Sequence, residues 1–408
     1  MWGSKKWQSQ TFRALAHRNY RLYWASQLVS LFGSWMQIVA LNWLAYRLTH
    51  SPLALGLLNF VAVLPAGLFM LAGGAISDRL PGRRLLLVLE STLALQALIL
   101  AVLTWMDVVT IWHVAIVMFV VGAANSLEVP ARAVLVMDVV GESDYPNAVG
   151  LNSAMINLAR AAGPAVAGWV IGTSGEAVCF ALNAFSYLAV IAALGLMRLS
   201  PSACPREPLR IGSDTLTGIR YAWRNPAIRT LLVVIAIPSL LAQPAILLLP
   251  VFAQDVLHVD ATGYGWLMGM VGGGAVIGAL IAGGLNANKR QWGLVTGSLL
   301  FPAFLVLFAL SRWLPMSLAL LFGAALGQSL QLVVAYSMLL LTAQAEFRGR
   351  VASSYALLSN GLNRMGGVPL GFAAQVWGAP IAVLSGASLS LIWALVVIWR
   401  MPVVRKLK

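Results

Sequence analysis

Long apolar runs separated by short polar or basic stretches make up almost the entire chain. A membrane-spanning helix needs about 20 predominantly apolar residues, and runs of that length recur down the sequence. Because the bilayer core offers no water to backbone polar groups, such runs predict helices. We therefore predict an all-α membrane protein with twelve transmembrane helices, at 22–48, 53–76, 85–106, 111–137, 148–172, 177–197, 229–253, 262–286, 293–311, 314–341, 351–375 and 379–401.

The composition excludes a water-soluble fold. Of the 408 residues 60% are hydrophobic and only 10% are charged, and the mean hydropathy is +0.83, whereas soluble domains carry about 25% charged residues. Two cysteines and four scattered histidines support neither a disulfide framework nor a metal site. The sequence has no nucleotide-binding loop and no nucleophile–base motif, so we expect no metal, no cofactor and no enzymatic activity.

The basic residues predict the orientation. Lys and Arg number 27 against 13 Asp and Glu, and 22 of the 27 fall in the N-terminal stretch, the alternate loops, the central segment and the tail, all on one side of the predicted membrane. Basic loops stay on the cytoplasmic side, so both termini are expected to be cytoplasmic, in the inner (plasma) membrane. The basic N-terminus runs into a long span without a small-residue cleavage site, so no cleavable signal peptide is expected. This bias explains the net charge of +14 without a nucleic-acid partner.

The sequence repeats itself on either side of its longest polar segment, 198–228. This segment divides an N-terminal half, 1–197, from a C-terminal half, 229–408. Three matches keep the same order at separations of 206, 203 and 204 residues: 11–19 with 217–225, 125–128 with 328–331, and 160–163 with 364–367. A near-constant separation favours duplication into two pseudo-symmetric six-helix halves, which is how many secondary transporters are built.

A glycine-rich and basic segment, 73–84, follows the second predicted span. Paired glycines allow close helix packing, and a basic cluster stays with the anionic leaflet. The segment resembles the loop motif of the major facilitator superfamily, G-x-x-x-D-R followed by basic residues, although Pro81 and Gly82 depart from it. The resemblance implies a conformational gating loop at Gly74, Asp78, Arg79, Arg83 and Arg84. A simple basic turn is the alternative.

Longer motifs narrow the resemblance. Residues 129–132, 146–153 and 157–168 are similar to the branch of enterobactin-exporter-like proteins, also called transmembrane secretion effectors. The resemblance implies a twelve-helix exporter of a small molecule, usually proton-coupled. We expect the protein to be a monomer. Gly163, Pro164 and Gly168 look like the fifth-span packing motif of antiporters in the superfamily, which favours export over uptake. The superfamily's arginine in the fourth span, expected near Phe119, is absent, so a coupling role borrowed from it does not carry over.

Ionisable residues inside a span are costly and mark function by default. In the fourth span Asn125, Glu128 and Arg132 have the spacing of one helix face, and Glu128 can pair with Arg132 four residues on. Two interpretations stay open for Glu128, a structural lock and a proton-binding carboxylate. Asp138 is a second proton-coupling candidate, or ties the loop to Arg132 or Asp78. Glu90 is expected to reach the membrane interface in a structural role.

Further polar residues fall in several spans. Arg160, with Asn157 one turn before it, and its counterpart Arg364 lie near the middle of the fifth and eleventh spans. They are expected either to attract an anionic substrate or a carboxylate such as Glu128, or to join the two halves. Polar stripes predict helices that line a wet cavity, with helix–helix hydrogen bonds as the alternative; they contain Gln27, Ser30, Ser34 and Gln37 in the first span and Gln328 and Gln331 in the tenth.

These features together predict an inner-membrane secondary transporter. It would export a small organic molecule, such as a siderophore-like metabolite or a drug, in exchange for protons, by alternating access. A transporter or flippase of lysophospholipid or another amphipath is the first alternative, and a non-transporting receptor or scaffold the second. The sequence does not identify the substrate.

Overall fold

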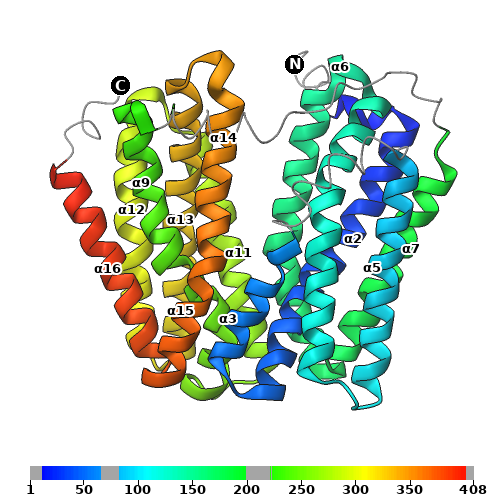
Figure 1. Ribbon diagram of the computed structural model, residues 1–408, viewed down its shortest axis with the longest axis horizontal. Coiled ribbons are helices and arrows are strands. Elements are labelled where there is room, and N and C mark those ends of the chain that lie inside the picture. Colours follow the sequence, from blue (N-terminus) through cyan, green and yellow to red (C-terminus); the bar gives the residue numbers. More distant parts are fainter. Residues whose placement is uncertain (1–11, 66–81, 199–220, 222, 401–408) are drawn as a thin grey trace, which may run out of the picture. The chain divides into compact units, whose positions relative to one another are not determined.

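The computed structural model describes residues 12–65, 82–198, 221 and 223–400, which in these ranges form helices and no strand (Figure 1). Contacts divide the chain into two compact units. The first comprises Met1–Leu41 and Val61–Leu209, and the second Asn42–Phe60 and Arg210–Lys408.

The first unit contains a short 3-10 helix and four long helices. They are η1 (Arg13–Ala16), α2 (Arg18–Thr49) as far as Leu41, α5 (Gly82–Trp105), α6 (Ile111–Ser174) and α7 (Glu176–Leu196). The sequence predicted two spans where the structure has α6, and the helical run is broken only at Gly141, with φ 75° and ψ 168°. Glycine adopts this backbone conformation at low cost because it has no Cβ.

The second unit contains the end of α2 and the remaining helices. They are α3 (Pro52–Val61), α9 (Pro226–Leu241), η2 (Gln243–Leu248), α10 (Leu249–Val251), η3 (Phe252–Val256), α11 (Ala261–Gly283), α12 (Ala287–Leu310), α13 (Leu314–Thr342), η4 (Ala345–Phe347), α14 (Arg348–Ala356), η5 (Leu357–Gly361), α15 (Leu362–Trp377) and α16 (Ala379–Arg400). In the predicted eleventh span, α14, η5 and α15 follow one another directly; η5 is a π-helical turn.

Nine helices in the described ranges are long and apolar enough to cross a membrane, with α6 counted once. The remainder of the predicted second span, from 66 on, lies outside the described residues. The predicted all-α membrane fold is thus confirmed, and the number twelve stays a prediction.

Close packing at glycines holds helices together in both units. A Cβ on Gly163 would come within 2.8 Å of the Trp35 Cβ, so α6 and α2 nearly touch there, and Pro164 and Gly168 are buried on the same helix. In the second unit α12 meets α13, where a Cβ on Gly297 would lie 2.7 Å from the Gly327 carbonyl oxygen. Small residues supply such contacts in membranes because lipid gives no hydrophobic drive between helices.

The backbone repeats at matched points of the two sequence halves. Gly175 ends α6 with φ 82°, and Gly378 ends α15 with φ 87°. His50 follows α2 with φ 44°, and His258 follows η3 with φ 52°. Non-glycine residues rarely adopt positive φ. Asp107 has it as well, with φ 55°, and the duplication inferred from the sequence stays a prediction.

Candidate functional site

Glu90 lies in the interior of the first unit. It shares the buried face of α5 with Leu86, Leu93 and Ala97, and its exposed fraction is 0%. The expectation that Glu90 reaches the membrane interface is therefore wrong. Its side chain bonds to residues of α2 and α6. Only a bonded partner makes the burial of a carboxylate tolerable.

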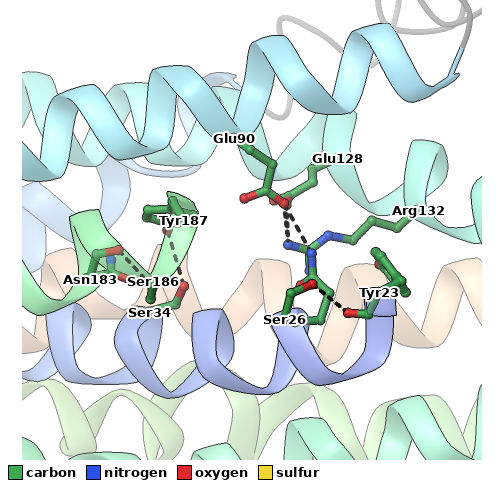
Figure 2. Close-up of polar contacts among 10 residues, drawn as sticks. Tyr23, Ser26, Ser34, Glu90, Glu128, Arg132, Asn183, Ser186 and Tyr187 are labelled. Carbon is green, nitrogen blue, oxygen red and sulfur yellow. Dashed lines mark hydrogen bonds and ion pairs between the residues drawn. The ribbon is translucent and has the colours of Figure 1, made fainter. Parts of the chain in front are cut away.

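Arg132 on α6 supplies that partner and holds a second carboxylate as well (Figure 2). Its Nη2 donates to Glu90 Oε1 at 3.2 Å and contacts Glu128 Oε1 in the expected pair four residues apart. Gln27 on α2 adds a hydrogen bond of 3.2 Å to the same Glu90 oxygen. We call Glu90, Glu128 and Arg132 the buried ion cluster.

The cluster lies in apolar surroundings. The core cluster around it includes Tyr23 on α2 with Leu89 and Leu93 on α5. Glu128 is 3% exposed, whereas the Arg132 side chain is 24% exposed and forms the accessible edge. Glu90 Oε2 is buried and has no hydrogen-bond partner among the described residues. Two ionised carboxylates on one guanidinium leave a net negative charge in a low dielectric, and one added proton removes it.

Gln27 and Gln37 do not line a wet cavity, contrary to expectation. They are 1% and 3% exposed, because their stripe on α2 faces α5 and α7. Gln37 donates to Gln96 Oε1 at 3.2 Å and accepts from Asn183. Ser34 bonds to the Tyr187 hydroxyl at 3.2 Å, on the same helix edge (Figure 2). The alternative of helix–helix hydrogen bonds is the correct one here.

The polar stripe on α13 contains Gln328 and Gln331, and only one of the two is buried. Gln331 is 2% exposed and donates to the Val234 carbonyl of α9 at 3.2 Å. Gln328, almost one turn earlier, is only partly buried. The structure thus leaves Gln328 as the one member of this pair that is open to a cavity or to lipid.

Asn125 and Asp138 lie outside the buried ion cluster. Asn125 is exposed although Glu128 is buried. Three residues turn a helix by about 300°, so the two side chains point about 60° apart, one to the exposed side of α6 and the other to its buried side. Asp138 is exposed near the break at Gly141. The ion pairs that the structure gives to Arg132 are with Glu90 and Glu128.

Most of the expected gating loop, including Gly74, Asp78 and Arg79, lies outside the described residues. Arg83 donates to the Gly195 carbonyl near the end of α7 at 2.9 Å. A cation that bonds to a carbonyl at the C-terminal end of a helix stabilises that end. Through this bond Arg83 links the start of α5 to the end of α7. Arg84 is exposed.

The two mid-span arginines are both exposed. The Arg160 guanidinium lies 5.4 Å from the centre of the Trp35 ring, and Asn157 Nδ2 bonds to the Ser153 carbonyl of its own helix at 2.9 Å. Among the described residues neither Arg160 nor Arg364 has an ion pair. The expected attraction of these arginines to Glu128 is not seen, because Arg132 occupies that carboxylate.

Glu90 is the functional candidate that the sequence reasoning undervalued. It occurs at the position that would continue the spacing of Leu86, Leu93 and Ala97, so a carboxylate within this apolar spacing on α5 was the available signal. In the part of the chain that is described, no group of three or more His, Cys, Asp and Glu residues could hold a metal ion.

Membrane-length helices with ionisable side chains held in their interior define a polytopic membrane protein. Residues 9–407 match the family described as transmembrane secretion effector, and the chain belongs to this family of the major facilitator superfamily. The family is named for transmembrane secretion, which is a transport role and not an enzymatic one.

Relatives in the superfamily include transporters and efflux pumps. The staphyloferrin A transporter of Staphylococcus aureus is 27% identical over 64% of this chain and 66% of its own. The multidrug efflux pump Tap of Mycolicibacterium fortuitum is 26% identical over 61% and 62%, and macrolide efflux protein A of Streptococcus pyogenes is 22% identical over 62% and 65%. The chain spans just under two thirds of the length of each of these relatives.

Solved structures share the fold at low identity. The nucleoside transporter NupG has a TM-score of 0.71 at 12% identity and covers 96% of this chain and 100% of its own. A bacterial homologue of the iron transporter ferroportin has a TM-score of 0.70 at 13% identity, with coverages of 92% and 98%. These similarities establish the major facilitator fold and leave the substrate open.

Proposed function

We propose that the protein exports a small organic molecule across the inner membrane in exchange for protons. Its two six-helix halves, 1–197 and 229–408, would alternate access to a substrate site, with both termini in the cytoplasm. Support comes from the secretion-effector family, from relatives named for a siderophore and for drugs, and from the one-sided distribution of basic residues.

The observation that carries the coupling proposal is the stoichiometry of the buried ion cluster. Glu90 and Glu128 share the single guanidinium of Arg132, and the described part of the chain offers Glu90 Oε2 no hydrogen-bond partner. A proton on either carboxyl group makes the cluster neutral, which lowers the cost of keeping it dry. Deprotonation restores a net charge that only hydration or rearrangement relieves.

The cluster is also placed to turn that charge change into motion. Glu90 belongs to α5, whereas Glu128 and Arg132 belong to α6. A proton on Glu90 weakens the ionic link between the two helices, and a proton on Glu128 frees Arg132 to serve Glu90 alone. Pro130 lies between Glu128 and Arg132 and removes a helix hydrogen bond, so this part of α6 bends at low cost. A proton thereby biases one of two arrangements, as coupling requires.

Everted membrane vesicles test the proposal. Cells that lack the gene are first compared with cells that carry it, for resistance to a macrolide and for release of a siderophore. The compound whose resistance or release depends on the gene is then supplied to everted vesicles with an acidic lumen. We expect accumulation that collapses when a protonophore dissipates the pH gradient. Accumulation that persists without any gradient would contradict proton antiport. Movement of lysophosphatidylglycerol alone would favour the amphipath alternative.

A further inference from the structure

Arg160 and Arg364 are placed deep in their helical runs. Arg160 lies 14 residues before the end of α6 at Ser174, and Arg364 lies 13 residues before the end of α15 at Trp377. At about 1.5 Å per residue, each Cα is about 20 Å from its helix end, well inside a hydrocarbon core of about 30 Å. An exposed guanidinium at that depth requires water or a ligand, because lipid solvates it poorly.

The face that carries Arg160 is distinct from the lipid-type face of α6. Ser153, Asn157 and Arg160 are exposed and follow one another at spacings of four and three residues. Most exposed apolar side chains of the same segment, those of Leu158, Val166 and Trp169, point to the opposite side of the helix, whereas Val149 lies on the Arg160 side, one turn before Ser153. From Ser153 to Arg160 the exposed face is therefore polar, and the opposite exposed face is apolar.

The helical run of α14, η5 and α15 shows the same division. Asn360 and Arg364 are exposed one turn apart. Met365, Phe372 and Val376 form a separate exposed apolar face. Each unit, taken by itself, thus presents an amide followed by an arginine on a polar face at corresponding points of the repeated sequence.

Among the described residues neither arginine has a counter-charge, which distinguishes both from Arg132. The carboxylates of Glu90 and Glu128 are engaged by Arg132, and the residues described here offer Arg160 only the Trp35 ring. Stacking on an aromatic ring orients a guanidinium and leaves its N–H donors free. Those donors form a planar fork that matches a carboxylate or a phosphate.

We propose that Arg160 and Arg364 each bind an anionic group of the exported molecule, so that the substrate is an organic anion carrying carboxylate or phosphate. This inference rests on the proposed transport function and specifies its substrate class. The anionic group could belong to a soluble metabolite or to a lipid headgroup, and both sources share the chemistry that the guanidinium groups recognise.

Binding to the purified protein in detergent tests the inference without any proton gradient. The thermal unfolding midpoint is measured with citrate, inorganic phosphate, lysophosphatidylglycerol or the cationic dye ethidium. We expect an anion to raise the midpoint of the wild type, and Arg160→Gln and Arg364→Gln each to weaken that anion's apparent affinity about tenfold or more. Arg160→Lys should restore part of the loss because it keeps the charge. The control Arg18→Gln makes the same change at the start of α2 and should bind as the wild type.

Three outcomes would overturn the inference: no midpoint shift with any anion, equal anion binding by wild type and both glutamine variants, or stabilisation by ethidium alone. A shift with lysophosphatidylglycerol but not with citrate or phosphate would assign the anionic group to a lipid. Anion binding is measured at equilibrium without a gradient, so a failure of proton antiport would not change the binding result. If anion binding is lost, proton antiport is still tested independently by accumulation in the vesicles.

Discussion

Arg132 on α6 donates a 3.2 Å hydrogen bond to Glu90 on α5, 42 residues earlier in the chain. The same guanidinium contacts Glu128 on its own helix, so one cation serves two carboxylates from two helices. When both carboxylates are ionised the cluster has a net negative charge, and a single added proton neutralises it.

Neutralising one carboxylate should uncouple transport from protons without abolishing it. Glu90→Gln and Glu128→Gln each fix the cluster in a state like the protonated one. We expect both variants to keep substrate exchange across vesicles at equal pH and to lose at least tenfold of the accumulation driven by a pH gradient. Glu142→Gln, at an exposed site on α6, is the matched control and should accumulate substrate normally. Gradient-driven accumulation at the wild-type level in Glu90→Gln would remove Glu90 from the coupling step.

Removing the cation should destabilise the protein more than removing the whole cluster. Arg132→Met leaves two buried carboxylates unpaired, which is expected to cost about 3–5 kcal/mol in the free energy of unfolding. The triple variant Glu90→Gln, Glu128→Gln, Arg132→Met buries no charge and should recover most of that loss. Denaturation in detergent micelles measures both. Equal destabilisation of the single and triple variants would show that Arg132 acts through packing and not through charge.

Tyr46 and Asp255 should contribute unequally to the stability of the second unit. Tyr46 is 2% exposed, and its hydroxyl donates to the exposed Asp255; both residues border a hollow of about 490 Å³. Asp255→Ala strands the buried hydroxyl and should cost about 1–3 kcal/mol, whereas Tyr46→Phe leaves a carboxylate that water can solvate and should cost less. Asp255→Asn keeps an acceptor and serves as the control. The reverse order in thermal unfolding would contradict this account.

The glycine contact between α11 and α13 should not accept a methyl group. A Cβ on Gly274 would collide with the Phe322 carbonyl, and one on Gly278 with the Leu326 carbonyl, both of which are backbone atoms that cannot turn aside. We expect Gly274→Ala and Gly278→Ala each to lower the unfolding free energy by about 1–3 kcal/mol. Gly283→Ala, on the same helix with open space around its Cβ, should be close to neutral in the same assay.

Local periodicity predicted those features that depend on one helix alone. The apolar runs predicted the helical class, and the four-residue spacing predicted the pair of Glu128 with Arg132, which the structure contains. These features follow from helix geometry, so they can be predicted without knowing which helices are neighbours.

The tertiary structure decided which faces are covered. It buried Glu90 against a cation 42 residues away, turned Gln27 and Gln37 from expected cavity residues into helix–helix contacts, and left Asn125 exposed beside a buried glutamate. It also grouped Asn42–Phe60 with the second unit. A sequence shows that a polar residue lies on a helix face, but only the neighbouring helix determines whether that face meets a bonded partner, water or lipid, and the energetic cost of a buried charge depends on that difference.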